Sequence, residues 1–153
     1  MGAKDVLKFI KNKQAEFVDL RFTDPRGKLQ HLTMDATIVD EDMINDGVFF
    51  DGSSIAGWKA INESDMILKP DSDRMFVDPF TSHNTVVLFC DILDAIKKTP
   101  YERDPRGVAK KAEAYLRKSG VGDKAFFGPE PEFFDFDDVK IKNDMNESSF
   151  KID

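Results

Sequence analysis

FGPEPEFF, residues 127–134, is the stretch around which the rest of the chain is organised. Its prolines, Pro129 and Pro131, each lack an N–H and fix φ, which excludes a helix interior. Side chains alternate between the two faces of a strand, so Glu130 and Glu132 are expected on one face. The other face holds only Phe and Pro and is expected to pack on a core. Because two donors are missing, the predicted strand belongs at a sheet edge or beside an irregular neighbour.

Two glutamates on one wall of a strand have two interpretations. They can be exposed side chains on a solvated face, since Glu is seldom buried unless it is paired. They can also bind a divalent cation, because two carboxylates about 7 Å apart repel each other in a dry cleft unless cations lie between them. Oxygen ligands suit Mg²⁺ or Mn²⁺ better than zinc. Glu130 and Glu132 alone leave such a site incomplete.

Composition limits the function classes. The 153 residues are 41% hydrophobic with 14 Phe, so a packed core is feasible. A formal charge of −7 makes the chain a poor candidate for nucleic-acid binding, which needs clustered Lys and Arg. Cys90 is the only cysteine, which suits a reducing compartment, and no signal peptide or membrane-spanning run is read. We therefore expect a cytoplasmic protein without nucleic-acid or membrane partners.

The first hundred residues alternate between strand-like and helix-like patterns. An amphipathic helix is predicted within 4–13, a hairpin from 17–23 and 29–34, and a short helix capped by Asp40 and ended by Gly47. Three further strands are predicted at 66–68, 75–77 and 85–90. The last of these is continuously apolar and is therefore expected to be central. This order predicts an α+β domain over residues 1–103.

A loop at residues 51–59 is the second candidate for function. Its Gly and Ser content predicts a loop, which starts at Asp51 and carries the sole tryptophan, Trp58. A surface loop with Trp58 packed against the protein is one interpretation. A substrate-contacting loop is the other, since binding residues concentrate on such segments.

A second domain is predicted to begin at Asp104. Asp104 and Pro105 form a helix start with a cap and a proline at the first helical position, and Gly120 ends this helix. The predicted strand 127–134 follows, whereas residues 142–153 show no clear element. Residues 104–153 are few for an independent core.

Several segments together resemble bacterial-type glutamine synthetase. They are FVDLRFTD at 17–24, FDGSSI at 50–55, NESDM at 62–66, RDPR at 103–106 and FFGPEPEFF at 126–134. They run over nearly the whole chain, in order and at family spacing. The resemblance implies a β-grasp-like domain at 1–103, followed at 104–153 by the start of the catalytic α+β domain.

The resemblance implies a function in glutamine biosynthesis and nitrogen metabolism. The family joins glutamate and ammonia with hydrolysis of ATP, through a γ-glutamyl phosphate. Two Mg²⁺ or Mn²⁺ ions stabilise charge and act as a template. By match of motif, Glu130 and Glu132 correspond to ligands of different ions, and Asp51 to the aspartate that helps bind and deprotonate ammonium across a subunit interface. The family assembles as stacked rings, so a homo-oligomer is expected.

The resemblance covers only part of the family's catalytic domain. The other metal ligands, the ATP pocket and the arginines that hold glutamate would lie beyond Asp153. We therefore expect a fragment that is inactive alone and binds divalent cations weakly. Two alternatives stay open: a non-catalytic assembly or binding module, and a related ligase that joins glutamate to another amine.

Overall fold

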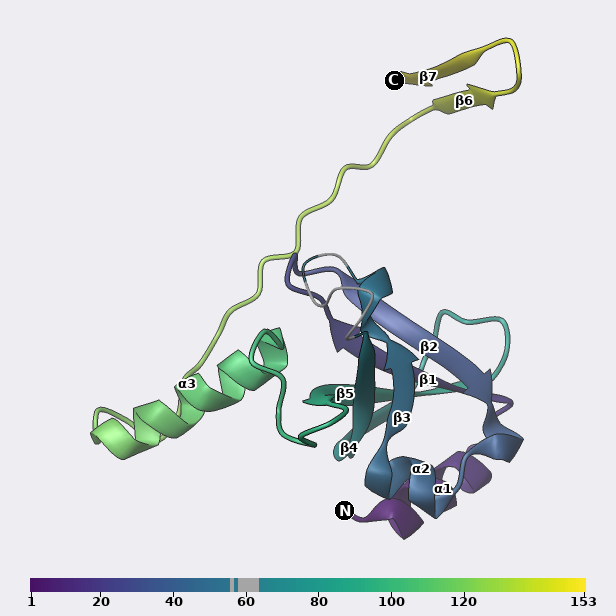
Figure 1. Ribbon diagram of the computed structural model, residues 1–153. Helices are drawn as coiled ribbons and strands as arrows, with labels where there is room; N and C mark the ends of the chain where they lie inside the picture. Colours follow the sequence, from purple (N-terminus) through teal and green to yellow (C-terminus); the bar gives the residue numbers. More distant parts are fainter. Residues whose placement is uncertain (56, 58–63) are drawn as a thin grey trace.

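A five-stranded mixed sheet with two helices on one face forms the body of the protein, and a third helix, an extended segment and a hairpin follow it (Figure 1). The structure is a computed structural model and describes residues 1–55, 57 and 64–153. The elements are α1 (Ala3–Asn12), β1 (Phe17–Thr23), β2 (Leu29–Asp35), η1 (Ala36–Ile38), α2 (Glu41–Asp46), β3 (Val48–Asp51), η2 (Gly52–Ser54), β4 (Asp65–Val77), β5 (Thr85–Asp94), α3 (Pro105–Ser119), β6 (Val139–Asn143) and β7 (Ser148–Ile152). None of the helices in these ranges has the length and apolar character of a membrane-spanning helix.

The sheet has the strand order β2-β1-β5-β4-β3, with β1 and β5 parallel and the other pairs antiparallel. β5 lies at its centre, as its continuous apolar run predicts, and Val86, Val87 and Leu88 are fully buried. The hairpin of β1 and β2 is also confirmed, with Leu20 opposite Leu32. A parallel pair at the centre of a sheet covered by helices matches the expected β-grasp-like α+β fold.

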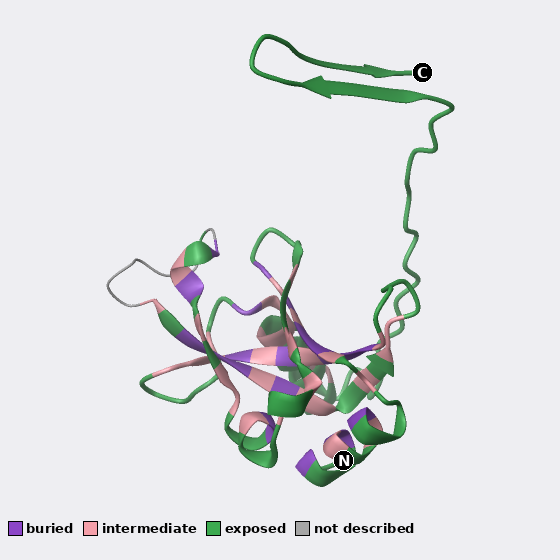
Figure 2. Cartoon of the chain, turned by 90° about the vertical axis from the view of Figure 1, so that its right-hand side faces the viewer, coloured by how far each residue is buried: buried purple, intermediate pink, exposed green. Residues whose placement is uncertain are grey.

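The hydrophobic core lies between the sheet and the helices α1 and α2. Val6 and Ile10 of α1 and Ile44 of α2 pack on the face that Leu20 and Leu88 share. The apolar spacing of α1 and the alternation of β1 agree with these contacts, since only one face of each element is apolar. Figure 2 shows buried residues concentrated in the sheet and in the two helices beside it.

Helices α2 and α3 begin and end where their capping residues predict. The Asp40 side chain accepts a hydrogen bond from the backbone N–H of Met43 at 2.8 Å, and Gly47 follows the last turn of α2 with φ +88°. Asp104 caps α3, and Gly120 ends it in the left-handed conformation. Capping groups satisfy backbone donors and acceptors that the helix itself leaves unpaired.

The two short strands predicted at 66–68 and 75–77 form one strand, β4, whose pairing with β5 is irregular between Pro70 and Met75. Pro70 is tolerated because β3 pairs with β4 only as far as Leu68, so the outer edge of β4 is open beyond that point. The sequence pattern correctly indicated a break in regular pairing near Pro70. The prediction that one strand ends there and another begins at 75 was wrong.

The strand predicted at 127–134 is not formed. This segment has no regular secondary structure, and Phe127 and Phe133 are almost fully exposed instead of packing on a core. It runs outward from α3 toward the hairpin in both views (Figures 1 and 2). A strand requires a hydrogen-bonded neighbour, and no other described strand pairs with this segment. The extended backbone imposed by its prolines is therefore present without a sheet.

A hairpin lies where no element was predicted. β6 and β7 pair antiparallel from Val139 opposite Ile152 to Asn143 opposite Ser148, with every residue exposed. Ile141 and Phe150 are directly opposite each other, and this alternation about a polar turn was the available signal. An isolated two-stranded hairpin is only marginally stable in water.

Candidate functional site

Asp51 ends the edge strand β3 and begins the short 3₁₀ helix η2. Its carboxylate accepts a hydrogen bond from the backbone N–H of Ser53 at 2.9 Å, and its carbonyl oxygen accepts one from the Ser54 hydroxyl at 2.8 Å. An aspartate at this position satisfies a donor that the first helical turn leaves free. The loop predicted at 51–59 thus begins as an ordered turn with an exposed carboxylate.

The Asp51 carboxylate remains charged to low pH. Hydrogen bonds from the Ser53 hydroxyl and the Ser53 backbone N–H hold the pKa of Asp51 below its usual value, with a further contribution from Ser64. Hydrogen bonds to the ionised form favour that form. The group can therefore attract a small cation at neutral pH.

Close packing fixes the start of this loop against β4. The backbone N–H of Gly52 donates to the carbonyl of Ser64 at 2.7 Å. A Cβ on Gly52 would lie 2.4 Å from the sulfur of Met66, so any other residue there requires the buried Met66 side chain to shift. Ile55 is buried and anchors the other end of the turn. The prediction for Trp58 falls outside the described residues.

Glu130 and Glu132 are both exposed in the extended segment after α3. Neither makes a hydrogen bond or an ion pair with another described residue, and the structure does not bring either one to Asp51. Glu132 lies with Pro131, Phe133 and Phe134 along a shallow hollow of the segment itself. The three candidate site residues are therefore on two separate parts of the structure.

The carboxylates of Glu130 and Glu132 are ligands of the type that a hard divalent cation prefers, but two of them are too few to complete its coordination shell. Carboxylate oxygens are the ligands that Mg²⁺ and Mn²⁺ prefer, whereas a six-coordinate shell needs more than two side chains. Within residues 1–55, 57 and 64–153, no three His, Cys, Asp or Glu side chains gather where they could hold a metal ion. A complete metal centre therefore needs ligands besides Glu130 and Glu132.

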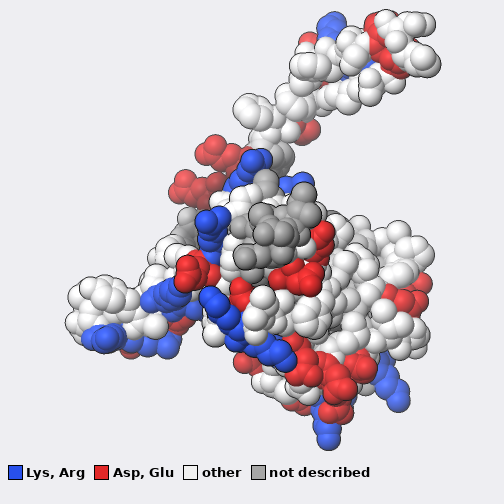
Figure 3. All heavy atoms as spheres, in the orientation of Figure 1, with Lys and Arg blue, Asp and Glu red and all other residues white. Residues whose placement is uncertain are grey.

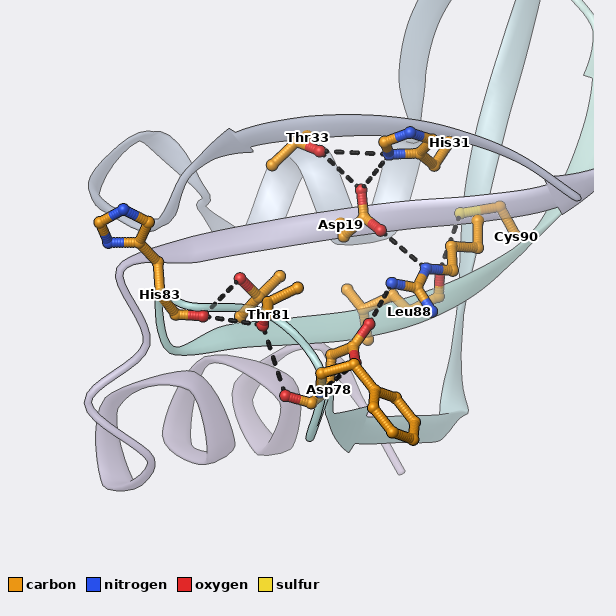
Figure 4. Close-up of polar contacts among 11 residues, drawn as sticks. Asp19, His31, Thr33, Asp78, Thr81, His83, Leu88 and Cys90 are labelled. Atoms are coloured by element: carbon orange, nitrogen blue, oxygen red, sulfur yellow. Dashed lines mark hydrogen bonds and ion pairs between the residues drawn. The ribbon is translucent and has the colours of Figure 1, made fainter. Parts of the chain in front are cut away.

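A polar cluster on the sheet face opposite α1 and α2 was not predicted. Asp19 is buried there and accepts hydrogen bonds from Thr33 Oγ1 at 2.7 Å, Arg21 Nε at 2.7 Å and His31 Nδ1 at 2.9 Å (Figure 4). Arg21 also contacts the carboxylate of Asp78, beyond the end of β4. The cluster thus ties β1 and β2 to the segment that follows β4.

This cluster does not have the arrangement of a catalytic triad. Thr33 donates to the carboxylate and lies 3.3 Å from His31 Nδ1, the same nitrogen that faces Asp19. In a triad the hydroxyl meets the opposite ring nitrogen, Nε2. The signal that could have found the cluster is strand register, since Asp19 is paired with Thr33, and Arg21 with His31.

Models of two protein families match the chain in succession. One is described as "Glutamine synthetase, beta-Grasp domain" and matches residues 14–95. The other is described as "Glutamine synthetase, catalytic domain" and matches residues 102–153. The first match covers the sheet, and the second covers α3 and everything that follows it.

Similar proteins of known sequence and structure have the same family name. The chain is 64% identical over 151 residues to the glutamine synthetase of Rhizobium meliloti and 61% identical over 151 residues to that of Azorhizobium caulinodans. In both cases the match covers 99% of this chain and 32% of the relative, so the chain spans about a third of the length of these curated relatives. A cryo-EM structure of Plasmodium falciparum glutamine synthetase, 22% identical, superposes with a TM-score of 0.77 over 99% of this chain and 29% of that one, which supports the fold.

Proposed function

From the premise that this chain belongs to the glutamine synthetase family, we propose that it acts as the amino-terminal part of an ATP-dependent ligase that joins glutamate to ammonia. The observation that carries this proposal is the 64% identity to a glutamine synthetase over nearly the whole chain. The proposed role is glutamine biosynthesis in nitrogen metabolism, with a polypeptide as long as the relatives carrying the complete activity. We retain 1–103 and 104–153 as the proposed division between the β-grasp domain and the start of the catalytic domain.

Asp51 is the proposed binding group for ammonium. A carboxylate that is exposed, ordered and charged at neutral pH suits a small cation, which gains more from a charge than from an apolar slot. After glutamate has been phosphorylated, ammonium transfers a proton to the carboxylate. The nitrogen lone pair of ammonia then attacks the acyl carbon of the γ-glutamyl phosphate and the C–N bond forms. Phosphate leaves with the electrons of the C–O bond, and the nitrogen loses one further proton to solvent or to the departing phosphate, which gives the amide.

Glu130 and Glu132 are the proposed metal ligands, one for each of two Mg²⁺ or Mn²⁺ ions. Such ions neutralise phosphate charge and hold the reacting groups in place. This proposal rests on the motif at 126–134 and on donor chemistry. Because the two side chains fill only part of a coordination shell, the chain alone is expected to bind these ions weakly.

A homo-oligomer with sites between subunits is the proposed assembly, with stacked rings as in the family. The separation of Asp51 from Glu130 and Glu132 within one chain is compatible with a site to which two subunits contribute. Glutamate, ammonium and ATP are the proposed ligands, with no nucleic-acid or membrane partner. The cytoplasm is the proposed compartment, and a sole cysteine that is a buried free thiol suits a reducing environment.

A hybrid enzyme tests the function directly. This chain would replace the matching first third of the Rhizobium meliloti glutamine synthetase, and product formation would be measured with glutamate, ammonium, ATP and Mg²⁺. The hybrid is expected to make glutamine, and Asp51→Asn in it is expected to lower turnover by roughly 10²-fold or more. The unjoined chain should be inactive. A folded hybrid without turnover, or turnover by the unjoined chain, would contradict the proposal.

The same hybrid separates the two remaining functions. Methylamine in place of ammonium tests for a ligase that uses another amine, and a higher kcat/KM with methylamine would favour that class. The exposed aromatic side chains at 126–134 favour an assembly role instead. That role alone would hold if the hybrid assembled normally and produced neither glutamine from ammonium nor the γ-glutamyl methylamide from methylamine.

A further inference from the structure

The segment RDPR, residues 103–106, lies where the sheet ends and α3 begins. β1 pairs with β5 only as far as Phe89, which leaves the edge of β5 open beyond it. The chain returns along this edge after β5: the backbone N–H of Tyr101 donates to the carbonyl of Ile92 at 2.8 Å, and Leu93 forms a bridge with Pro100. The start of α3 is thus held in register with the central strand.

Asp104 joins the strand to the helix through a single carboxylate. The residue is 1% exposed, and one oxygen accepts from the backbone N–H of Ile92 at 3.3 Å while the other accepts from that of Arg106 at 3.0 Å. Burial raises the pKa of Asp104, so its hydrogen bonds only partly offset the loss of water. The buried carboxylate thus links the backbone of β5 to that of the first turn of α3.

Arg106 fastens the first turn of α3 to two neighbouring strands. Its Nε donates to Asp91 of β5 at 2.8 Å, and its terminal nitrogen contacts Asp71 of β4. Lys110, one turn further along, also contacts Asp91. The Arg106 and Asp91 side chains are each only 26% exposed, so solvent screens this pair less than a surface pair.

Apolar packing contributes little to this attachment. No residue of α3, from Pro105 to Ser119, is buried, and the apolar side chains of Val108 and Tyr115 on this helix are largely exposed. Figure 3 shows basic and acidic side chains gathered where α3 meets the rest of the molecule. The direction in which α3 leaves the sheet therefore depends on directional polar contacts.

Arg103 extends the junction to the loop that starts at Asp51. Its guanidinium donates to the carbonyl oxygen of Gly57 at 2.9 Å. One four-residue segment thus contacts the candidate ammonium loop, the central strand and the helix that leads to Glu130 and Glu132. The three candidate site residues, Asp51, Glu130 and Glu132, lie at the far ends of the parts that this segment connects.

We propose that residues 103–106 form a positioning junction, in which Asp104 and Arg106 set the direction of α3 and Arg103 restrains the Asp51 loop. None of these residues is proposed to touch substrate or metal. The geometric role of the junction does not depend on the proposed function. Only the inference that the junction helps to place Asp51, Glu130 and Glu132 for catalysis rests on that function.

Electron–electron distance measurements on the 153-residue chain test the helix part of the junction. Spin labels at Lys28→Cys and Lys118→Cys, both at exposed positions, report the distance from the sheet to the end of α3. Cys90 is buried with a raised thiol pKa and should remain unlabelled. The parent chain is expected to give one narrow distance peak, and Arg106→Gln or Asp104→Asn a broad distribution with the sheet still folded by circular dichroism.

Arg117→Gln is the matched control, because Arg117 lies on the same helix and pairs only with Glu113 of that helix among the described residues. It should leave the narrow peak unchanged. Arg106→Lys keeps the charge but loses the two-armed geometry, so it should restore the peak only in part. An unchanged narrow peak in both Arg106→Gln and Asp104→Asn would overturn the proposal, and so would equal broadening by Arg117→Gln.

Amide hydrogen exchange tests the loop part. Arg103→Gln is expected to speed exchange in residues 51–55 and at Gly57 while leaving the spin-label peak in place. Unchanged exchange there would refute the role of Arg103. Neither readout requires glutamine synthesis, so failure of the junction and failure of the proposed function can be told apart.

Discussion

Asp19 illustrates how a residue's neighbours decide its environment. Its place in the alternation of β1 predicts a polar side chain on the outer face of a half-buried strand, and that face assignment is correct. The residue is nevertheless only 4% exposed, because Arg21, His31 and Thr33 surround it. Burial of a charged group is tolerated only where hydrogen bonds replace the lost water.

The Asp19 cluster predicts acid-sensitive stability. Burial raises the pKa of Asp19, but hydrogen bonds from Thr33, Arg21 and His31 outweigh it, so the net shift is downward. The folded state then binds a proton less readily than the unfolded state. Stability from this group is present above the unfolded pKa and is lost as pH falls through the lowered pKa.

Asp19→Asn should remove that dependence. At neutral pH it is expected to cost about 1.5 to 3 kcal/mol, the range for hydrogen bonds to charged groups. Urea unfolding as a function of pH would show a smaller loss of stability in acid than for the parent chain. Asp135→Asn, at an exposed position, is the control and should follow the parent curve. Parallel acid limbs for Asp19→Asn and the parent would contradict the assignment.

Single residues of the site were predictable in type, and partners that are near in sequence could be inferred, whereas partners on another strand could not. The sequence placed Asp51 at the start of a loop, which the structure confirms. Its hydrogen bonds to Ser53 follow from a local turn and could have been inferred from spacing. The contact of His31 with Asp19 depends on strand register, which sequence pattern alone does not fix.

At the scale of elements, the end of α2 gives a sharp test of backbone geometry. Gly47 has φ +88°, and a Cβ there would lie 2.4 Å from Ile67 Cγ2 and 2.6 Å from the Leu68 carbonyl oxygen. Gly27 has nearly the same φ, +84°, with nothing within 4 Å of the added atom. Gly47 also has ψ −179°, a combination that is nearly restricted to glycine, so backbone strain and steric overlap both oppose a side chain there, whereas Gly27 meets no overlap.

Gly47→Ala is expected to destabilise the protein by about 3 kcal/mol or more, because strain and overlap add. Gly27→Ala should cost only about 1 kcal/mol, the backbone term alone. Chemical denaturation of both variants measures the difference. Equal losses in the two variants would show that the close approach of β4 to Gly47 is relieved at no cost.

Local signals predicted most elements, and long-range pairing explains where they failed. Caps at Asp40 and Asp104 marked helix starts correctly because the groups they satisfy are near in sequence. The extended form of 127–134 follows from its prolines, but strand formation needs a partner that the described chain does not place there. β6 and β7 were missed because residues 142–153 look polar unless the alternation across the turn is compared.

At the scale of the whole molecule, stability and the candidate metal ligands lie in different parts of the chain. Every buried core residue falls between Ala3 and Ile92, whereas residues 123–153 are exposed throughout. The sequence therefore predicted the sheet domain well, since the chain contains the packing partners that its patterns require. It could not predict how Glu130 and Glu132 are arranged, because no described residue packs against them.

This division predicts that removing residues 123–153 leaves folding intact and abolishes self-association. The shortened chain, 1–122, should have the same urea midpoint as the full chain, because no core contact is lost. Deletion of residues 1–13 is the opposing control and should unfold the sheet, since it removes the buried Val6 and Ile10.

Self-association is expected of the full 153 residues because their exposed segment carries a run of unburied aromatic side chains, namely Phe126, Phe127, Phe133, Phe134 and Phe150. Sedimentation velocity over a concentration series should show species larger than the monomer for the full chain and a monomer for 1–122. Substitution of Phe133 and Phe134 by Ser should shift the full chain toward monomer without changing its urea midpoint, since neither ring packs on the core. A full chain that sediments as a monomer at every concentration would show that these rings do not drive association, and a lower midpoint for 1–122 would show that the segment contributes to the stability of the sheet.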